Sequence, residues 1–133
     1  TLNTAANRRF VAAFKQKYGR NRLINDPIQS AYVAVYLWKQ AVERAGTADD
    51  LEKIRRAALG ISLNAPEGQI TMTNNHHLSR FVRIGRVRND GLFDIVYQSK
   101  RAIAPQPWNQ QIPETRGFAC DWSDPSKGRK YRF

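Results

Sequence analysis

The sequence predicts an α/β fold in which three helices come first, short strands and a β-hairpin follow, and an irregular tail ends the chain. Up to residue 60, apolar residues recur at helical spacing in three stretches, each bounded by residues that begin or end helices. From Ile61 to Ser99 the pattern changes to short runs separated by turn residues. The length of 133 residues suits one ordinary domain. No apolar run reaches the roughly 20 residues that a membrane-spanning helix needs.

The first helix is expected over Thr4–Tyr18. Asn3 or Thr4 can cap its start, and Gly19 is a natural stop. The apolar side chains that stack on one side of it are Phe10, Val11, Phe14 and Tyr18. At this spacing an aromatic stripe is more typical of a core than of a surface that stacks on bases.

The second helix is expected to begin at Asn25-Asp26-Pro27 and to run to about Arg44, with Gly46 ending it. Pro27 suits the first helical position, because the amide hydrogen that it lacks would be unpaired there anyway. The continuous apolar stripe of this helix, typical of a buried face, consists of Ile28, Ala31, Tyr32, Val35, Trp38 and Val42. Apolar residues also lie beyond the stripe, at Val33, Tyr36 and Leu37. This breadth predicts a helix that is packed on more than one side.

A third, shorter helix is expected after the stretch Thr47-Ala48-Asp49-Asp50. In this stretch Thr47 can serve the free amides of the first turn, and Asp50 complements the helix dipole. The helix continues to Leu59, and Gly60 closes it. Its apolar stripe is narrow, so we expect it to lie on the outside.

The strands are expected after this helix. Ala65–Gly68 reads as a turn, and Gln69–Thr73 as a strand with Ile70 and Met72 on one face. Farther on, Asn89-Asp90-Gly91 is a strong hairpin signal, because Asp-Gly accepts the positive backbone angles of a tight turn. The flanking strands are Phe81–Arg88 and Leu92–Ser99. Both faces of this hairpin carry apolar residues, which predicts that much of it is buried in a larger sheet.

The sequence gives no sign of an enzyme and predicts neither a cofactor nor a metal site. His76 and His77 are adjacent in a polar loop, with no third ligand at zinc-like spacing. No nucleophile motif and no phosphate-binding loop occur. Cys120 is the sole cysteine, so an intrachain disulfide cannot form.

The charge of +11 raises a rival hypothesis, a small basic module that binds nucleic acid or another polyanion. The hairpin carries cations close to aromatic residues, namely Arg80, Arg83, Arg86 and Arg88 beside Phe81, Phe93 and Tyr97. Such a ribbon suits single-stranded nucleic acid. A hairpin buried in a larger sheet is a poor platform for it, and the cations are dispersed over every segment. Nucleic acid is therefore disfavoured as a partner.

Three stretches closely resemble the C-terminal part of type I periplasmic binding proteins for urea and short-chain amides. They are NDPIQSAYVAVYLWKQAVERAGT (25–47), NAPEGQITMTNNHH (64–77) and VRIGRVRNDGLFDIVYQS (82–99). That family includes the solute receptors of ATP-driven urea importers and the cytosolic amide sensors that regulate amidase expression. The order and spacing match through about residue 108, which covers most of the chain.

The resemblance implies that this α/β chain is the C-terminal part of a bilobed fold whose lobes are joined by three crossing segments. Residues 1–81 would complete the first lobe. Residues 82–99 would form the last crossing and the terminal hairpin of the second lobe, and residues 100–133 an irregular basic tail. The hinge residues of the crossing would be Val82, Arg83, Ile84 and Gly85.

The resemblance also implies a function, the non-enzymatic binding of urea or a small amide between the lobes. Asp26 and Gln29 are the candidate ligand-binding residues; alternatively, Asp26 is only a helix cap and Gln29 reaches the ligand indirectly. The implied partners are the remaining N-terminal portion of the protein and the permease of an ATP-driven (ABC) importer. The implied location is periplasmic or extracytoplasmic, or cytoplasmic for an amide sensor.

Two further expectations concern the chain by itself. No signal peptide is visible, so Thr1 is interpreted as a processed end or an artificial boundary. Without the preceding lobes, the broad apolar faces of the second helix and of the hairpin would be exposed. Homo-oligomers formed through these faces are therefore expected, and a free-standing domain that dimerises through its hairpin is a third hypothesis.

Overall fold

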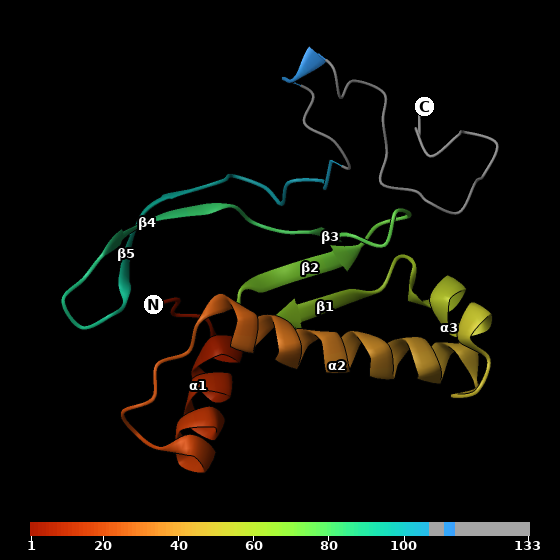
Figure 1. Cartoon of the computed structure of the whole chain (residues 1–133), viewed down its shortest axis with the longest axis horizontal. Helices are drawn as coiled ribbons and strands as arrows, with labels where there is room; N and C mark the ends of the chain where they lie inside the picture. Colours follow the sequence, from red (N-terminus) through yellow and green to blue (C-terminus); the bar gives the residue numbers. More distant parts are fainter. Residues whose placement is uncertain (107–110, 114–133) are drawn as a thin grey trace.

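The computed structural model describes residues 1–106 and 111–113, and these residues form three helices and five short strands (Figure 1). In chain order the elements are α1 (Ala5–Tyr18), α2 (Asp26–Ala45), α3 (Leu51–Ala58), β1 (Ser62–Ala65), β2 (Gly68–Met72), β3 (Leu78–Ser79), β4 (Arg83–Val87) and β5 (Phe93–Gln98). The predicted α/β class and element order are confirmed. The prediction of an irregular tail falls largely on residues 107–110 and 114–133, which lie outside the described residues.

The starts of the helices follow from side-chain caps. Thr4 Oγ1 accepts a hydrogen bond from the Asn7 amide at 3.0 Å, and Asn25 Oδ1 accepts one from the Ile28 amide at 3.1 Å. At α3 the predicted cap was wrong in detail. Asp50, which directly precedes the first helical residue, caps the Lys53 amide, whereas Thr47 bonds only to the nearby Asp49 amide.

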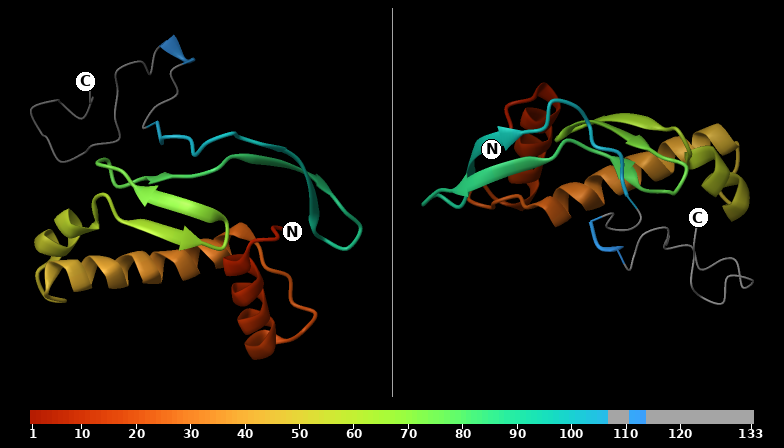
Figure 2. Two further views of the ribbon diagram at one scale, coloured as in Figure 1. Left: turned by 180° about the vertical axis from the view of Figure 1, so that it is seen from behind. Right: turned by 90° about the horizontal axis from the view of Figure 1, so that it is seen from above.

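The core lies between α2 and the elements that cover one side of it. The antiparallel sheet, with strand order β1-β2-β3, lies along α2, and α3 packs at the C-terminal end of α2 (Figures 1 and 2). The buried residues of this core are Val33, Leu37, Ala41, Ala45, Ile54, Ile61, Ala65 and Ile70. Helix α1 joins the N-terminal half of α2 through aromatic contacts, with the Phe10 and Tyr32 rings 4.6 Å apart. None of the described helices combines the length and the apolar character needed to cross a bilayer.

The face of α2 that is buried differs from the predicted stripe. The buried positions are four residues apart, at Gln29, Val33, Leu37, Ala41 and Ala45. Val35 and Trp38 of the predicted stripe are 64% and 57% exposed. The physical reason is that apolar residues surround most of this helix, so periodicity alone cannot tell which side α3 and the sheet cover. A second, uncovered apolar face remains on α2.

The predicted hairpin is confirmed, but its predicted burial is wrong for this chain. Strands β4 and β5 pair with each other around the predicted turn and form a sheet of two strands. Apolar side chains on it are exposed, as Ile84 is at 57% and Val87 at 71%. The reason is that, within the described residues, no third strand pairs with the hairpin and no helix covers it. Figure 1 shows the hairpin reaching away from the sheet that lies on α2.

Candidate functional site

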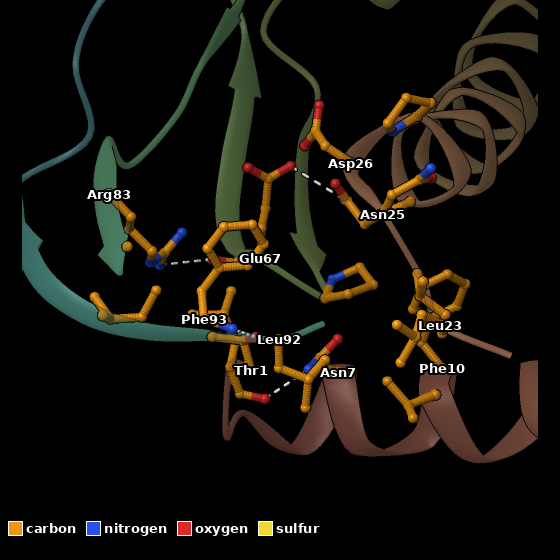
Figure 3. Close-up of a pocket in the computed structure, with 18 of the residues that line it drawn as sticks. Thr1, Asn7, Phe10, Leu23, Asn25, Asp26, Glu67, Arg83, Leu92 and Phe93 are labelled. Carbon is orange, nitrogen blue, oxygen red and sulfur yellow. Dashed lines mark hydrogen bonds between the residues drawn. The ribbon is translucent and has the colours of Figure 1, made fainter. Parts of the chain in front are cut away.

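An open cavity of about 1060 Å³ lies between one side of α1, the first turn of α2 with the loop before it, the β1–β2 turn and the β4–β5 hairpin (Figure 3). Both candidate ligand-binding residues, Asp26 and Gln29, are among its lining residues. Three of the four predicted hinge residues, Val82, Arg83 and Gly85, also line it. The structure thus brings together two groups of residues that are more than 50 positions apart in the sequence.

Four polar residues of the cavity wall contact one another and form what we call the Glu67 cluster: Asp26, Gln29, Glu67 and Arg80. The Arg80 guanidinium donates to the Glu67 carboxylate twice, from Nε to Oε2 at 2.8 Å and from Nη2 to Oε1 at 2.7 Å. The Gln29 amide donates to Glu67 Oε1 at 3.1 Å. Such two-pronged pairing of Arg with a carboxylate is a strong, directional contact.

The ion pair at the centre of this cluster is partly buried. The Glu67 side chain is 12% exposed and the Arg80 side chain 33% exposed, so the pair is partly shielded from water. The hydrogen bonds to Glu67 raise the pKa of Arg80 above its usual value, although desolvation opposes this rise. Arg80 therefore stays charged across the physiological pH range and remains a permanent partner for the carboxylate.

The two candidate ligand-binding residues occupy different environments in the cluster. Gln29 is buried, and both ends of its amide are engaged, since its Oε1 also accepts from Arg80 Nη2 at 3.3 Å. Asp26 is 75% exposed, and its carboxylate makes one long contact, 3.5 Å from Arg80 Nη2. The Asp26 carboxylate is thus largely open to solvent, whereas Gln29 holds Glu67 and Arg80 through its amide group.

The turn between β1 and β2 connects this cluster to the rest of the cavity. Arg83 Nη2 donates to the backbone carbonyl of Glu67 at 2.8 Å, and Thr4 Oγ1 donates to the carbonyl of Pro66 at 3.0 Å. Figure 3 shows Arg83 reaching from the hairpin side toward Glu67. The Pro66-Glu67 turn therefore contacts the start of α1, the start of α2 and the first residue of β4.

Gly85 occupies a crowded position in the hairpin. The pairing of β4 with β5 shifts register between Ile84 and Gly85, and a Cβ atom on Gly85 would lie 2.9 Å from Cβ of Phe93. A side chain there would push Phe93 aside. Ile84, the remaining predicted hinge residue, is exposed and is not among the residues that line the cavity.

We expect Gly85→Ala to destabilise the hairpin by about 1–3 kcal/mol, because the added methyl group overpacks against Phe93. Hydrogen–deuterium exchange should show faster exchange at β4 and β5 amides and unchanged exchange in α2. Val96→Ala, at a position that is 56% exposed, is the control and should change little. Unchanged protection of the hairpin in the Gly85 variant would contradict the prediction.

Sequence reasoning missed the roles of Glu67 and Arg80. Glu67 appeared only as part of a turn signal, and Arg80 only as one cation of the hairpin. The sequence offers no local signal for either role, because a glutamate between Pro66 and Gly68 fits a solvated turn as well as a shielded ion pair.

The histidines do not join this site. The His77 imidazole Nδ1 lies 2.9 Å from the Asn75 carbonyl oxygen, which is a local contact within the turn. His76 has a positive φ of 60°, as residues in tight turns do. Among the described residues, no three His, Cys, Asp or Glu side chains come together in a way that could hold a metal ion.

Comparison with known proteins assigns residues 1–114 to the family described as periplasmic binding protein domain. Three solved structures share the fold. An ABC-transporter solute-binding protein from Rhodopseudomonas palustris BisB5, in complex with 3,4-dihydroxybenzoic acid, has a TM-score of 0.65 and 20% identity over 77% of this chain. A leucine-binding protein from Thermotoga maritima has a TM-score of 0.61 and 27% identity over 72%. An amino-acid ABC-transporter substrate-binding protein from Pseudomonas fluorescens Pf-5 has a TM-score of 0.56 and 19% identity over 78%.

This chain spans only part of its relatives. It covers 29%, 27% and 29% of the three solved chains, in the same order. A protein named limonene hydroxylase, from Geobacillus stearothermophilus, is 35% identical over 107 residues, and the match covers 20% of that protein and 80% of this chain. A match to a fifth of a protein does not extend that protein's activity to this chain.

Proposed function

The chain belongs to the periplasmic binding protein domain family, and from that premise we propose that it is the C-terminal part of a solute-binding protein that serves an ABC importer. The observation that carries the proposal is the cavity between the start of α2 and the hairpin, since it combines an exposed carboxylate with shielded polar groups. The proposed action is binding and release rather than turnover. The proposed partners are the remaining N-terminal portion of the protein and the membrane permease. The proposed location is extracytoplasmic.

The proposed solute is urea or a short-chain amide. The exposed Asp26 carboxylate can accept hydrogen bonds from the N–H groups of a planar amide. Phe81 and Phe93, which line the cavity, offer apolar faces against such a planar molecule. A cytosolic sensor of amides would use the same chemistry and remains an alternative within this proposal.

The proposed division of the chain follows from its packing. Residues 1–81 hold the whole buried core cluster and are assigned to the first lobe. Residues 82–99 hold the separate two-stranded sheet and are assigned to the hinge crossing and the second lobe. Residues 100–133 remain assigned to a basic tail. Ligand binding between lobes would then draw the hairpin and the start of α2 together.

We expect a longer protein, extended to the length of the solved relatives, to bind urea or acetamide in isothermal titration calorimetry. The 133-residue chain alone should bind at least about 100-fold more weakly, because one wall of a two-lobed site supplies only part of the contacts. Asp26→Asn in the longer protein should weaken binding by roughly tenfold, as for the loss of one charge-assisted hydrogen bond. Tight binding by the short chain would contradict the two-lobed site.

A second candidate solute class is small carboxylates with an apolar body, including apolar amino acids. Lys15 and Arg22 line the cavity, and neither forms an ion pair within the described part of the chain. Phe10 and Leu23 add apolar walls beside them. The leucine-binding relative supports this class. The same titration with leucine and benzoate discriminates the classes: binding of these with no response to acetamide would favour carboxylates.

Nucleic acid remains disfavoured as a partner, although the hairpin is exposed. Most of its arginines are engaged: Arg80 pairs with Glu67, Arg83 binds the turn, and Arg88 contacts Asp90 at 2.7 Å and Asp94 at 3.3 Å. Engaged arginines are poor phosphate ligands. Filter binding to a labelled oligonucleotide should therefore be weak, with a shallow dependence on salt; a slope equivalent to several phosphate contacts would reverse this conclusion.

A further inference from the structure

We propose that Arg83 is a positioning residue that fixes the angle of the β4–β5 hairpin by clamping it to the β1–β2 turn. The inference rests on the proposed function, in which the hairpin belongs to the lobe that moves. It concerns the contact that sets how far the hairpin stands from the start of α2 when no ligand is bound. No ligand contact is assigned to Arg83.

The turn is a fixed point to which a clamp can attach. Pro66 restricts its own backbone, and its carbonyl accepts from Thr4 at the start of α1. The Glu67 carboxylate is held by Arg80 and Gln29. Because Pro66 and the Glu67 side chain are both held, the backbone carbonyl of Glu67 is a hydrogen-bond acceptor at a fixed position.

Arg83 connects this acceptor to both strands of the hairpin. Its Nη2 donates to the Glu67 carbonyl at 2.8 Å, while its Nε donates to Gln98 Oε1 at 2.7 Å. Gln98 is the residue opposite Arg83 in the β4–β5 pairing. The guanidinium also lies 5.6 Å from the centre of the Phe81 ring. The planar guanidinium group of Arg83 has several N–H donors and can make these contacts together. A lysine ammonium group cannot make them in the same geometry.

Arg83 lies directly before an irregularity in the pairing of β4 with β5, which suits a residue that holds the base of the hairpin. The register shift between Ile84 and Gly85 begins one residue farther along β4. Such irregularities bend and twist a strand locally. Arg83 therefore holds the base of the hairpin on the side of the core, and the bend lies beyond it.

Other contacts between the hairpin and residues 1–81 lie at its base and near its tip. At the base, Arg80 and Ile103 exchange two backbone hydrogen bonds, at 3.2 and 2.8 Å, where the chain enters and leaves the hairpin. The Phe93 amide donates to Thr1 Oγ1 at 3.2 Å, and Gly91 lies against Leu23. The hydrogen bonds between Val82 and Ser99 join the two ends of the hairpin segment to each other and not to the core. Arg83 is thus the side-chain contact that joins β4 itself to the β1–β2 turn. Its loss would let the hairpin pivot about the Arg80–Ile103 bridge.

The proposal is tested by pulsed electron double resonance on the 133-residue chain. The parent is Cys120→Ser with spin labels at Val87→Cys in the hairpin and Lys53→Cys on α3, measured with excess unlabelled chain so that distances between molecules do not contribute. We expect Arg83→Gln and Arg83→Lys each to give a distance distribution roughly twofold broader than the parent, as a fixed segment becomes locally mobile. Arg86→Gln, a neutralised arginine on the same strand, is the matched control and should leave the distribution unchanged. Equal distributions in parent and Arg83 variants, with helix content retained by circular dichroism, would overturn the proposal.

A second measurement separates this proposal from the proposed function. In the longer protein, Arg83→Gln should change the dissociation constant of whichever solute binds by roughly tenfold, in line with one charge-assisted hydrogen bond, and Arg86→Gln should not. If the longer parent binds no solute, the proposed function fails while the distance result still decides the clamp. If the parent binds and the Arg83 variant binds equally well, the clamp does not set the binding geometry and that part of the proposal is overturned.

Discussion

Glu67→Gln should lower the free energy of unfolding of this chain by about 2–3 kcal/mol. The substitution removes the charge that Arg80 faces and leaves a partly buried guanidinium with a weaker acceptor. The full penalty for breaking a buried ion pair is larger, roughly 3–5 kcal/mol, but Arg80 is a third exposed and water screens part of the loss. Urea denaturation followed by circular dichroism measures the change.

The matched control for this substitution is Asp26→Asn in the same cluster. Asp26 is 75% exposed and lies 3.5 Å from Arg80, so its contact should contribute less than about 0.5 kcal/mol. A double-mutant cycle with Glu67→Gln and Arg80→Gln isolates the pair itself, with an expected coupling of about 1–2 kcal/mol. A coupling near zero would mean that the two side chains do not depend on each other and that the cluster is not a fixed point.

The parts of the fold that the sequence predicted are those set by neighbours along the chain. The caps at Thr4 and Asn25 act on amides three residues away, and Gly46 ends α2 in the left-handed conformation that glycine accepts at no steric cost. The Asp90-Gly91 turn likewise pairs strands that are adjacent in sequence. Local chemistry was sufficient for each of these elements.

The parts that sequence reasoning missed depend on contacts between distant residues. Gln29 meets Glu67 across 38 positions, and Thr4 meets Pro66 across 62. No local pattern distinguishes these partners from other polar residues. The same holds for the buried face of α2, where Val33 rather than Val35 is covered, because the choice belongs to α3 and the sheet. The predicted roles of Asp26 and Gln29 came from family resemblance and stay predictions until ligand binding is measured.

We expect the 133-residue chain to self-associate through the uncovered face of α2. This face comprises three large side chains that are 41–64% exposed: Val35, Tyr36 and Trp38. An exposed apolar surface of this kind favours association. Covering Val35 and Trp38 alone should contribute about 3–5 kcal/mol, which corresponds to roughly 100–4000-fold in affinity. Sedimentation velocity over a concentration series should therefore give a mass that rises above 15.3 kDa.

The double variant Val35→Lys/Trp38→Lys should stay at the mass of one chain over the same series. Because the chain already carries +11, the added charge could by itself oppose association. Gln16→Lys/Ala48→Lys adds the same charge at exposed positions away from this face and is the matched control, which should still associate. In a protein of the length of the solved relatives, this face is proposed to be covered by the rest of the first lobe, so the longer protein should remain monomeric without either substitution. A longer protein that associates as strongly as the short chain would place the uncovered face on the outside of the lobe.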